Sequence, residues 1–249
     1  MALAFLAPAL VLYVVFVLYP IVQSARYSLY SWNGLGPLDD FVGLDNFRQA
    51  FNDKYFREAL RHNVIIIVLS LVLQIPAALG LAVLLNSRIK GRAALRLLFF
   101  APYVLSEVVT CVVWRQILRP DGMLDQALGA VGAGGLSREW LADPDIVLYS
   151  MFFVITWKYF GFHMIIMLAG LQQIPDALRE AAAVDGATPW LTFRHITLPL
   201  LGPTIRVSVF LSVIGALQLF DLVWVTTRGG PINKSSTMAT FLYERFGDR

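Results

Sequence analysis

Three ionisable side chains stand inside long apolar stretches of this chain and raise the first question about its chemistry. Glu107 and Lys158 each lie about halfway along such a stretch, and Asp221 lies near the far end of another. If the stretches cross a membrane, ionisable groups at that depth are costly unless they are paired or hydrated. We therefore expect them to face the protein interior or a water-filled path instead of lipid.

The three histidines do not form a set that could bind a metal or catalyse a reaction. His62 lies at the edge of one apolar stretch, His163 lies inside another, and His195 lies in a polar loop. The single cysteine, Cys111, leaves no partner for an internal disulfide. We expect no catalytic residues, no metal site and no cofactor bound by this chain, and we disfavour a membrane enzyme.

The longest polar interruption in the second half of the chain runs from Glu180 to Pro199. A short alanine-rich helix is predicted over 176–185, with Pro175 in its first turn and carboxylates near its start, where the helix dipole favours them. Gly186 suits the left-handed residue that ends a helix. The alanines give this helix a thin surface, to which the backbone of another protein could come close.

A second short helix is predicted after this hinge. Thr188 suits its N-cap, Pro189 suits its first turn, and Pro199 is expected to help end it. In the first helix, Glu180 offers a carboxylate that an arginine fork of a partner could bind. The stretch is thus predicted to be a helical hairpin with a surface for another protein.

The composition is that of an integral membrane protein. Hydrophobic residues make up 57% of the 249 residues and charged residues only 15%, whereas about 25% of residues in soluble domains are charged. The mean hydropathy is +0.65. The formal net charge of +3 is too small to indicate a nucleic-acid partner.

We predict an all-α bundle of membrane-spanning helices that forms a single domain over residues 1–249. A span needs about 20 apolar residues. The first apolar segment is interpreted as a retained helix, because a secretory signal would have a basic start and a shorter apolar run. Five segments are long enough: about 2–22, 62–85, 97–118, 146–170 and 203–226.

The distribution of basic residues predicts the orientation of these spans. The short loop 86–96 carries four basic residues and no acid, which places it in the cytoplasm by the positive-inside rule. Since spans alternate in direction, the loop 171–200 is also cytoplasmic. The segments 26–60, 119–145 and 227–249 are then outside the membrane.

The polar loop matches a family motif at fixed spacing. It reads Glu180-Ala181-Ala182, three residues, Gly186, nine residues, Ile196, one residue, and Leu198-Pro199. This pattern resembles, at every defining position, the EAA loop of permease subunits in bacterial ATP-binding-cassette importers. The resemblance implies that these residues, together with Asp185, belong to a coupling helix that docks in a groove of a cytoplasmic ATPase subunit.

Other segments resemble the maltose and glycerol-phosphate branch of these permeases, and the resemblance covers almost the whole chain. Members of this branch usually have a basic tail before the first helix and a further span after the last outer loop. We therefore expect the complete protein to have a longer start and a sixth span. The segments are 41–46, 96–102, 169–175 and 218–226, followed by Gly229-Gly230-Pro231.

By this resemblance the chain is a permease subunit of a type I importer in the bacterial inner membrane. Its expected partners are a second, homologous permease subunit, two ATP-binding subunits, and an extracytoplasmic protein that delivers a sugar or a glycerol-phosphate-type solute. The sequence has no Gly-x-x-x-x-Gly-Lys-Ser/Thr motif, so ATP and Mg are expected on the ATP-binding subunits. An importer of phosphate or polyamine, and an ATPase-independent channel or secondary transporter, remain as alternatives.

Aromatic rings and amide groups suit sugars, and such residues within the spans are predicted to line the solute path. For each of them the alternative is ordinary packing against other helices or lipid. Trp32 and Trp224 are assigned instead to the outer membrane interface. The predicted path residues are Gln74, Trp157, Tyr159, His163 and Gln218, with the ionisable Glu107, Lys158 and Asp221.

Glu107 and Lys158 are predicted to lie at similar depth, because the third and fourth spans run antiparallel. One hypothesis is that they pair across the path. In the alternative each has its own partner, a serine or tyrosine for Glu107 and backbone carbonyls for Lys158. A protonated Glu107, which desolvation would favour, is a third interpretation.

Overall fold

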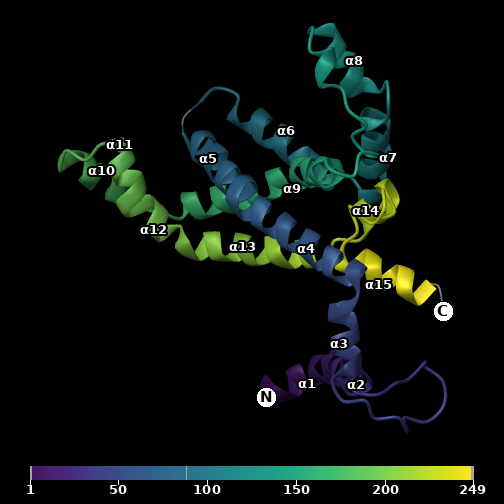
Figure 1. Ribbon diagram of the computed structural model, residues 1–249. Helices are drawn as coiled ribbons and strands as arrows, with labels where there is room; N and C mark the ends of the chain where they lie inside the picture. Colours follow the sequence, from purple (N-terminus) through teal and green to yellow (C-terminus); the bar gives the residue numbers. More distant parts are fainter. Residues whose placement is uncertain (1, 88, 248–249) are drawn as a thin grey trace. The chain divides into compact units, whose positions relative to one another are not determined.

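The computed structural model describes residues 2–87 and 89–247. These residues are helical, apart from turns, loops and one isolated antiparallel bridge between Tyr30 and Phe41. The chain divides into two compact units, residues 1–57 and 58–249, and each unit is described by itself. Figure 1 gives the labels of the helices.

The first unit is a long helical run followed by a loop and a short helix. Asn46 fixes the loop, because its side-chain amide donates hydrogen bonds to the carbonyls of Ser28 and Tyr30, each at 2.9 Å. Trp32 closes a turn by donating from Nε1 to the Gly36 carbonyl at 3.0 Å. The elements are α1 (Ala2–Tyr13), η1 (Val14–Leu18), α2 (Tyr19–Tyr27) and α3 (Asp45–Asn52).

The second unit is built around α9 (Val147–Gln172), the longest single helix of the unit. Helices α5, α6 and α13 pack against it. The helix α4, which begins just before the unit, continues through η2 into α5. The elements before α9 are α4 (Lys54–Leu69), η2 (Ser70–Gln74), α5 (Ile75–Asn86), α6 (Arg92–Val104), α7 (Glu107–Leu118), α8 (Met123–Ala130) and η3 (Gly134–Leu136).

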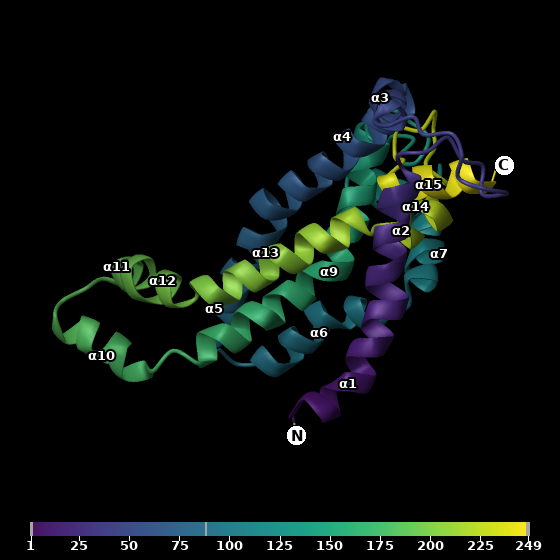
Figure 2. The ribbon, with the colours of Figure 1, turned by 90° about the horizontal axis from the view of Figure 1, so that it is seen from below.

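The elements after α9 lead to one end of the bundle and back. Figures 1 and 2 both show α10 to α12 at one end of α13, and α14 and α15 at its other end. The elements are α10 (Asp176–Val184), α11 (Pro189–Thr192), η4 (Phe193–Thr197), α12 (Leu198–Leu200), α13 (Gly202–Leu217), α14 (Asp221–Thr226) and α15 (Met238–Gly247).

Two glycines let neighbouring helices approach α9 closely. A Cβ on Gly161 would overlap the main chain of Phe99 and Phe100 in α6. A Cβ on Gly170 would lie only 2.7 Å from a methyl group of Leu201 and would also press on Thr204 at the start of α13. Helix α9 is therefore held against α6 and α13 by contacts that larger residues at 161 and 170 would disrupt.

Among the described residues, each π-helical turn ends two positions before a proline. The turns η1, η2 and η4 are followed after one residue by Pro20, Pro76 and Pro199. Proline has no N–H, so the usual bond to the carbonyl four residues earlier is lost. In each turn the N–H of the residue before proline instead reaches back five residues, as Ile75 does to the Ser70 carbonyl. These helices are widened where proline would otherwise break them.

Two of the predicted spans are divided in the structure. Within 97–118, α6 ends at Val104 and α7 begins at Glu107, bent by 100°. Pro102 lies in the last turn of α6, and Ser106 caps α7 by accepting a hydrogen bond from the Val109 N–H. Within 203–226, α13 ends at Leu217 and α14 begins only at Asp221.

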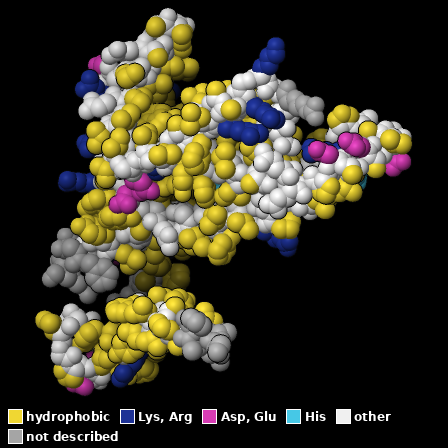
Figure 3. Space-filling view, turned by 180° about the vertical axis from the view of Figure 1, so that it is seen from behind, with side chains coloured by type: hydrophobic (Ala, Val, Ile, Leu, Met, Phe, Trp, Pro, Cys, Tyr) yellow, Lys and Arg dark blue, Asp and Glu magenta, His cyan; other side chains and the backbone are white. Residues whose placement is uncertain are grey.

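Among the described residues, three helices are long and apolar enough to cross a membrane. They are Leu6–Tyr27, Lys54–Asn86 and Val147–Gln172. Counting each of two bent helix pairs, Arg92–Val104 with Glu107–Leu118 and Pro189–Leu200 with Gly202–Leu217, as one span gives five. Hydrophobic side chains cover much of the face seen in Figure 3, as expected for a chain that meets lipid or partner subunits there.

The predicted outer loop 119–145 forms a small lobe around α8 and η3. The indole N–H of Trp140 donates to Asp125 Oδ1 at 2.9 Å. Hydrogen bonds from the Ser137 hydroxyl and the Trp140 indole lower the pKa of Asp125 below its usual range. The Asp125 carboxylate thus ties both ends of the lobe together in its ionised form.

Candidate functional site

The central turn of α9 carries polar and aromatic side chains between two apolar clusters. One cluster includes buried α9 residues of the segment 148–155 packed on α4, α7 and α14. The other includes residues of 164–171 packed on α5 and Leu201. Between the two clusters lie Lys158, Tyr159 and His163, so the middle of the bundle carries polar side chains between two apolar halves.

A cavity of about 240 Å³ opens beside this turn. It is lined by residues of α4 and η2, α6, α9 and α13, with Gln218 and Leu219 just beyond α13. None of these lining residues, all of which the structure describes, is Lys, Arg, Asp or Glu. The cavity brings together Gln74, Tyr159, His163 and Gln218 from the predicted path.

Gln74 places an unused hydrogen-bonding group at the cavity. Gln74 is only 2% exposed, and its Nε2 atom is buried without a hydrogen-bond partner among the described residues. Buried side-chain amides are nearly always satisfied. Gln74 is also the last residue of the widened turn before Pro76. The proline thus shapes the turn that carries this amide.

Aromatic rings form one wall of the cavity. Tyr103 from α6 stacks on Phe162 from α9, with ring centroids 4.7 Å apart and an interplanar angle of 17°. Tyr103 also meets Tyr159 edge to face, with centroids 6.1 Å apart. Tyr103 and Phe162 are absent from the predicted set, because aromatic residues are common in apolar helices and their spacing carries no further signal.

Hydroxyl groups of α13 face the same turn of α9. His163 Nδ1 and Ser208 Oγ are 2.7 Å apart, and both residues are buried. Nε2 is then the ring nitrogen of His163 left for another partner. Ser212, one turn further along α13, is buried and lines the cavity. Neither serine was predicted, since serine is frequent in membrane helices.

The other four predicted path residues do not line the cavity. Trp157 packs edge to face on Trp114, with ring centroids 5.4 Å apart. Asp221 is exposed at the start of α14. Glu107 and Lys158 lie near the break between α6 and α7.

Glu107 and Lys158 have separate partners in this structure. Lys158 Nζ donates to the Leu105 carbonyl at 2.6 Å. The Tyr159 hydroxyl donates to Glu107 Oε1 at 2.5 Å. No ion pair within 4.0 Å joins the two described side chains. The arrangement corresponds to the alternative with a tyrosine and a backbone carbonyl, not to the hypothesis of a pair.

The Glu180–Pro199 loop has the hinge that its sequence predicts. After α10, Gly186 has a φ of 78°, and the N–H of Ala187 bonds to the Ala182 carbonyl at 2.9 Å, a pattern typical of a glycine-terminated helix. Thr188 caps α11 by accepting a hydrogen bond from the Leu191 N–H at 3.3 Å.

The second helix ends close to Pro199, as its sequence predicts. The helical path continues through α12 only to Leu200, and α13 begins at Gly202 after a bend of 65°. Directly before Leu198 lies the π-helical turn 193–197, in which the Leu198 N–H bonds to the Phe193 carbonyl. This turn accommodates the missing N–H of Pro199, and the helix ends one residue later.

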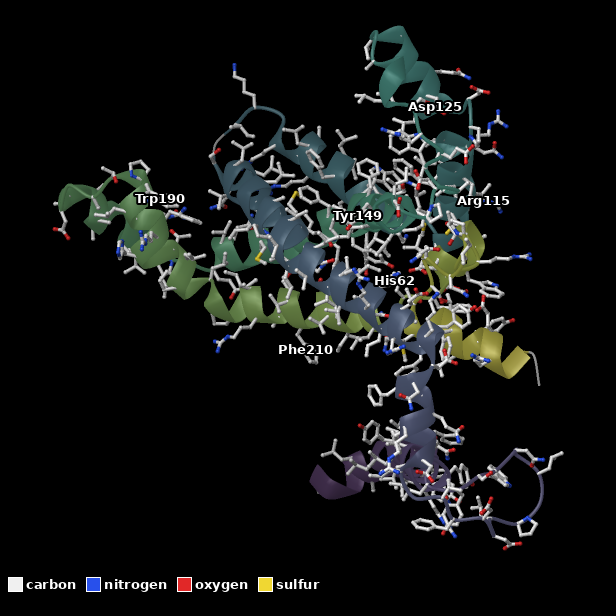
Figure 4. All side chains as sticks on the ribbon, viewed as in Figure 1. His62, Arg115, Asp125, Tyr149, Trp190 and Phe210 are labelled. Atoms are coloured by element: carbon white, nitrogen blue, oxygen red, sulfur yellow. The ribbon has the colours of Figure 1, made fainter. Side chains whose placement is uncertain are left out.

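The loop exposes apolar and acidic side chains together. Val184 is 88% exposed and Trp190 65% exposed, and both Glu180 and Asp185 are exposed. Figure 4 shows Trp190 at the far end of the bundle from Arg115 and Asp125. Ala182 is buried within the loop, so its small size serves the hairpin itself.

Several buried polar residues were not predicted as important. Asn63 donates to the Ala216 carbonyl at 2.5 Å and accepts from the Met238 N–H at 2.8 Å. The carbonyl of Ser236 lies 2.8 Å from His62 Nδ1. A polar residue in an apolar stretch was the only available signal, and it does not reveal a partner some 150 residues away.

Among the residues that the structure describes, no group of three or more His, Cys, Asp or Glu could hold a metal ion. Cys111 is buried on α7, with its Sγ atom 3.8 and 3.7 Å from the carbonyl oxygens of Asp221 and Leu222. The site is thus a polar, uncharged cavity together with a protruding loop at one end of the same bundle.

Comparison with protein families identifies this architecture. The family described as "binding-protein-dependent transport system inner membrane component" matches residues 74–244, which include both the cavity turn and the loop. The chain belongs to this family. It is therefore a membrane-embedded permease subunit of a binding-protein-dependent transport system.

Relatives of this permease match along almost its whole length. The lactose transport system permease protein LacF of Rhizobium radiobacter is 37% identical over 242 residues, which are 96% of this chain and 80% of that protein. The trehalose/maltose transport system permease protein MalF of Thermococcus litoralis is 32% identical, over 97% of this chain and 82% of that protein.

A solved structure has the same fold. A chain of a bacterial ABC transporter involved in the import of the acidic polysaccharide alginate superposes with a TM-score of 0.82 at 26% identity. The match covers 99% of this chain and 84% of that one. The predicted all-α permease fold is confirmed by this likeness.

Proposed function

We propose that this permease carries a neutral, hydroxyl-rich solute of the sugar class. The cavity at mid-bundle supports this, because its lining combines aromatic faces, a spare amide on Gln74 and hydroxyl groups without any Lys, Arg, Asp or Glu. Sugars present both apolar ring faces and hydroxyls, and such groups suit that lining. The names of the lactose and trehalose/maltose relatives point to the same class.

A charged solute fits the cavity less well. A phosphate or carboxylate would lose its hydration there and would find no arginine or lysine among the lining residues to replace it. A polyamine would find no carboxylate. We therefore favour a neutral sugar over glycerol phosphate, phosphate, polyamines or an acidic sugar such as the alginate carried by the structural neighbour.

The proposed assembly follows the family. A second permease subunit would complete the solute path, and two ATP-binding subunits would hydrolyse ATP, with Mg, below the membrane. An extracytoplasmic protein would deliver the solute; a structural neighbour is described as a transporter in complex with a periplasmic protein that holds an alginate pentasaccharide. The assembly would lie in the bacterial inner membrane.

The Glu180–Pro199 loop would couple this chain to an ATP-binding subunit. Its exposed Val184 and Trp190 offer an apolar contact, and the exposed Glu180 and Asp185 offer carboxylates for arginine. The motif positions Ala181, Ala182, Gly186, Ile196, Leu198 and Pro199 would shape that contact. The loop is joined to α9 by only three residues, so motion of the ATP-binding subunit would reach the cavity wall directly.

Gln74→Leu tests the solute site. In proteoliposomes with the whole transporter and excess binding protein, uptake should fall about two- to tenfold, the value of one hydrogen bond between neutral groups. Gln116→Leu is the matched control, because Gln116 is an exposed glutamine of α7 outside the cavity lining. An equal loss in both variants, or none in Gln74→Leu, contradicts the proposal.

Binding to the purified transporter without its binding protein tests the class of solute. A panel of radiolabelled neutral disaccharides, uronates and sugar phosphates would be compared by equilibrium dialysis. We expect the neutral sugars to bind and the charged compounds to bind at least about tenfold more weakly, because desolvating an uncompensated charge is costly. Equal binding of charged compounds would remove the assignment to neutral sugars.

A further inference from the structure

The break between α6 and α7 is held by neighbouring residues of α9. Only Leu105 and Ser106 separate the two helices, which are bent by 100°. A helix that ends within a membrane leaves carbonyl groups that need partners. The Ser106 carbonyl accepts from both the N–H and the hydroxyl of Thr110, each at 3.0 Å. The Leu105 carbonyl accepts from Lys158 Nζ at 2.6 Å.

Lys158 is a buried lysine held by a single main-chain acceptor. It is 3% exposed, and the Leu105 carbonyl is the acceptor that the structure shows for its amine. A lysine ammonium has three donors, and buried charged groups are costly unless well compensated. This contact therefore compensates the buried ammonium only in part, and water that reached Lys158 could replace it.

The next residue of α9 holds the other side of the break. The Tyr159 hydroxyl donates to Glu107, the first residue of α7. Two residues later, Gly161 brings α9 against the main chain of Phe99 in α6. Less than one and a half turns of α9 thus contacts the break, α7 and α6 in succession.

The buried cluster that joins α7 to α9 also includes α14. Cys111, Trp114 and Leu118 of α7 form a buried cluster with Leu222 and Val223 of α14. Cys111 is completely buried and lies against the carbonyls of Asp221 and Leu222. Displacement of α7 from α9 would therefore strain or open this cluster.

We propose that Lys158 is a positioning residue that latches the α6–α7 break, with the Tyr159–Glu107 bond as the second half of the latch. Release of this latch lets α7 swing and loosen from α14, and the continuous helix α9 links that release to the loop at the other end of the bundle. The role in transport rests on the proposed function, whereas the latch itself does not.

The test uses Cys111, the single cysteine of the chain, as a reporter of the α7–α14 contact. The whole transporter is assembled with cysteine-free partner subunits, and the rate of Cys111 modification by N-ethylmaleimide is followed by mass spectrometry without solute or ATP. Lys158→Met should raise this rate about tenfold or more, as expected for loss of a hydrogen bond from a charged group. Lys158→Arg, which keeps a donor, should stay close to the wild-type rate.

A second variant covers the case in which Lys158→Met fails to assemble. Tyr159→Phe removes only the hydroxyl that binds Glu107, and it should raise the modification rate about two- to fivefold, in line with one lost hydrogen bond. Lys90→Met, at a lysine of the short loop before α6, is the control for losing a positive charge and should leave the rate unchanged.

The modification rate decides the inference. If Lys158→Met assembles and Cys111 is modified at the wild-type rate, the latch is overturned, whether or not uptake is affected. If Lys158→Met does not assemble, an unchanged rate in Tyr159→Phe overturns it. A raised rate supports the latch even if the transporter proves to carry no sugar. A wild-type protein that fails to take up neutral sugars contradicts only the proposed function.

Discussion

Asn63 is completely buried, and both ends of its side-chain amide are used. It donates to the Ala216 carbonyl at the end of α13 and accepts from the Met238 N–H at the start of α15. The residue thereby joins α4 to two segments that follow it by about 150 and 175 positions. This amide thus joins three segments at the end of the bundle away from the Glu180–Pro199 loop.

Asn63→Leu should destabilise the protein by about 2–4 kcal/mol, because it leaves a carbonyl and an N–H buried without partners. The measurement is the thermal unfolding of the purified chain in detergent. Val64→Leu is the control, since Val64 is the next residue and is 51% exposed. Equal unfolding temperatures for Asn63→Leu and the wild type would show that these bonds contribute nothing.

Half of the predicted path residues meet at the cavity, and for those on α9 the helical period explains which ones do. Residues 155, 159, 162 and 163 of α9 line the cavity and share one face of a helix, whereas Trp157 and Lys158 lie on others. The sequence could not indicate which face this is, because α9 is apolar or buried on most sides. The glycine contact at Gly161, which sets that rotation, depends on α6 and is not visible in the local pattern.

The predicted helices were correct in kind, but the breaks within them were harder to predict. Pro102 and Ser106 are signals for ending one helix and starting another. In an apolar stretch of 22 residues, however, length favoured one span. At Pro199 the sequence signal agrees with the structure, because the helix ends at Leu200 and a bend of 65° follows. The sequence does not show where the backbone groups freed at a break find partners: the Leu105 carbonyl, for example, is bound by Lys158 of α9.

Pro76→Ala tests whether the widened turn places Gln74. Alanine supplies the missing N–H, so η2 should revert to a regular α-helix and rotate the Gln74 amide relative to the cavity. Uptake should fall about as far as in Gln74→Leu, and the combined variant should be no worse than either one, because the two changes remove one interaction. Uptake assays on the three variants give the comparison.

Pro20→Ala is the matched control for this experiment, since Pro20 follows η1 in the same way and lies in the other unit of the chain. It should leave uptake close to the wild-type level. If the losses in Pro76→Ala and Gln74→Leu multiply in the combined variant, the proline acts on transport by another route.

At the scale of the second unit, α9 connects the proposed sites of solute and ATPase contact. Its first part packs on α7 and α14, its central turn borders the cavity, and its last residue is only three residues from α10. A helix that is continuous over 26 residues transmits displacement along its axis. The loop at its end therefore needs a fixed shape if movement of an ATP-binding subunit is to reach the cavity.

Gly186→Val tests this requirement for a fixed loop. Gly186 has a φ of 78° and a Cβ there would meet nothing within 4 Å, so valine acts through backbone strain alone, about 1–2 kcal/mol. That strain should reshape the hinge between α10 and α11 without removing any contact of the bundle. ATP hydrolysis by the assembled transporter should continue, whereas uptake should fall at least about tenfold.

Gly132→Val separates the coupling role of Gly186 from general strain. Gly132 follows α8 with a φ of 77°, and a Cβ there also meets nothing within 4 Å, so the substitution imposes the same backbone strain in the lobe 119–145. Membrane insertion, ATP hydrolysis and uptake are measured for both variants side by side. Because only Gly186 lies between the two helices of the proposed ATPase contact, only its substitution should separate hydrolysis from uptake. Equal effects of the two substitutions would show that Gly186 is an ordinary turn residue with no role in coupling.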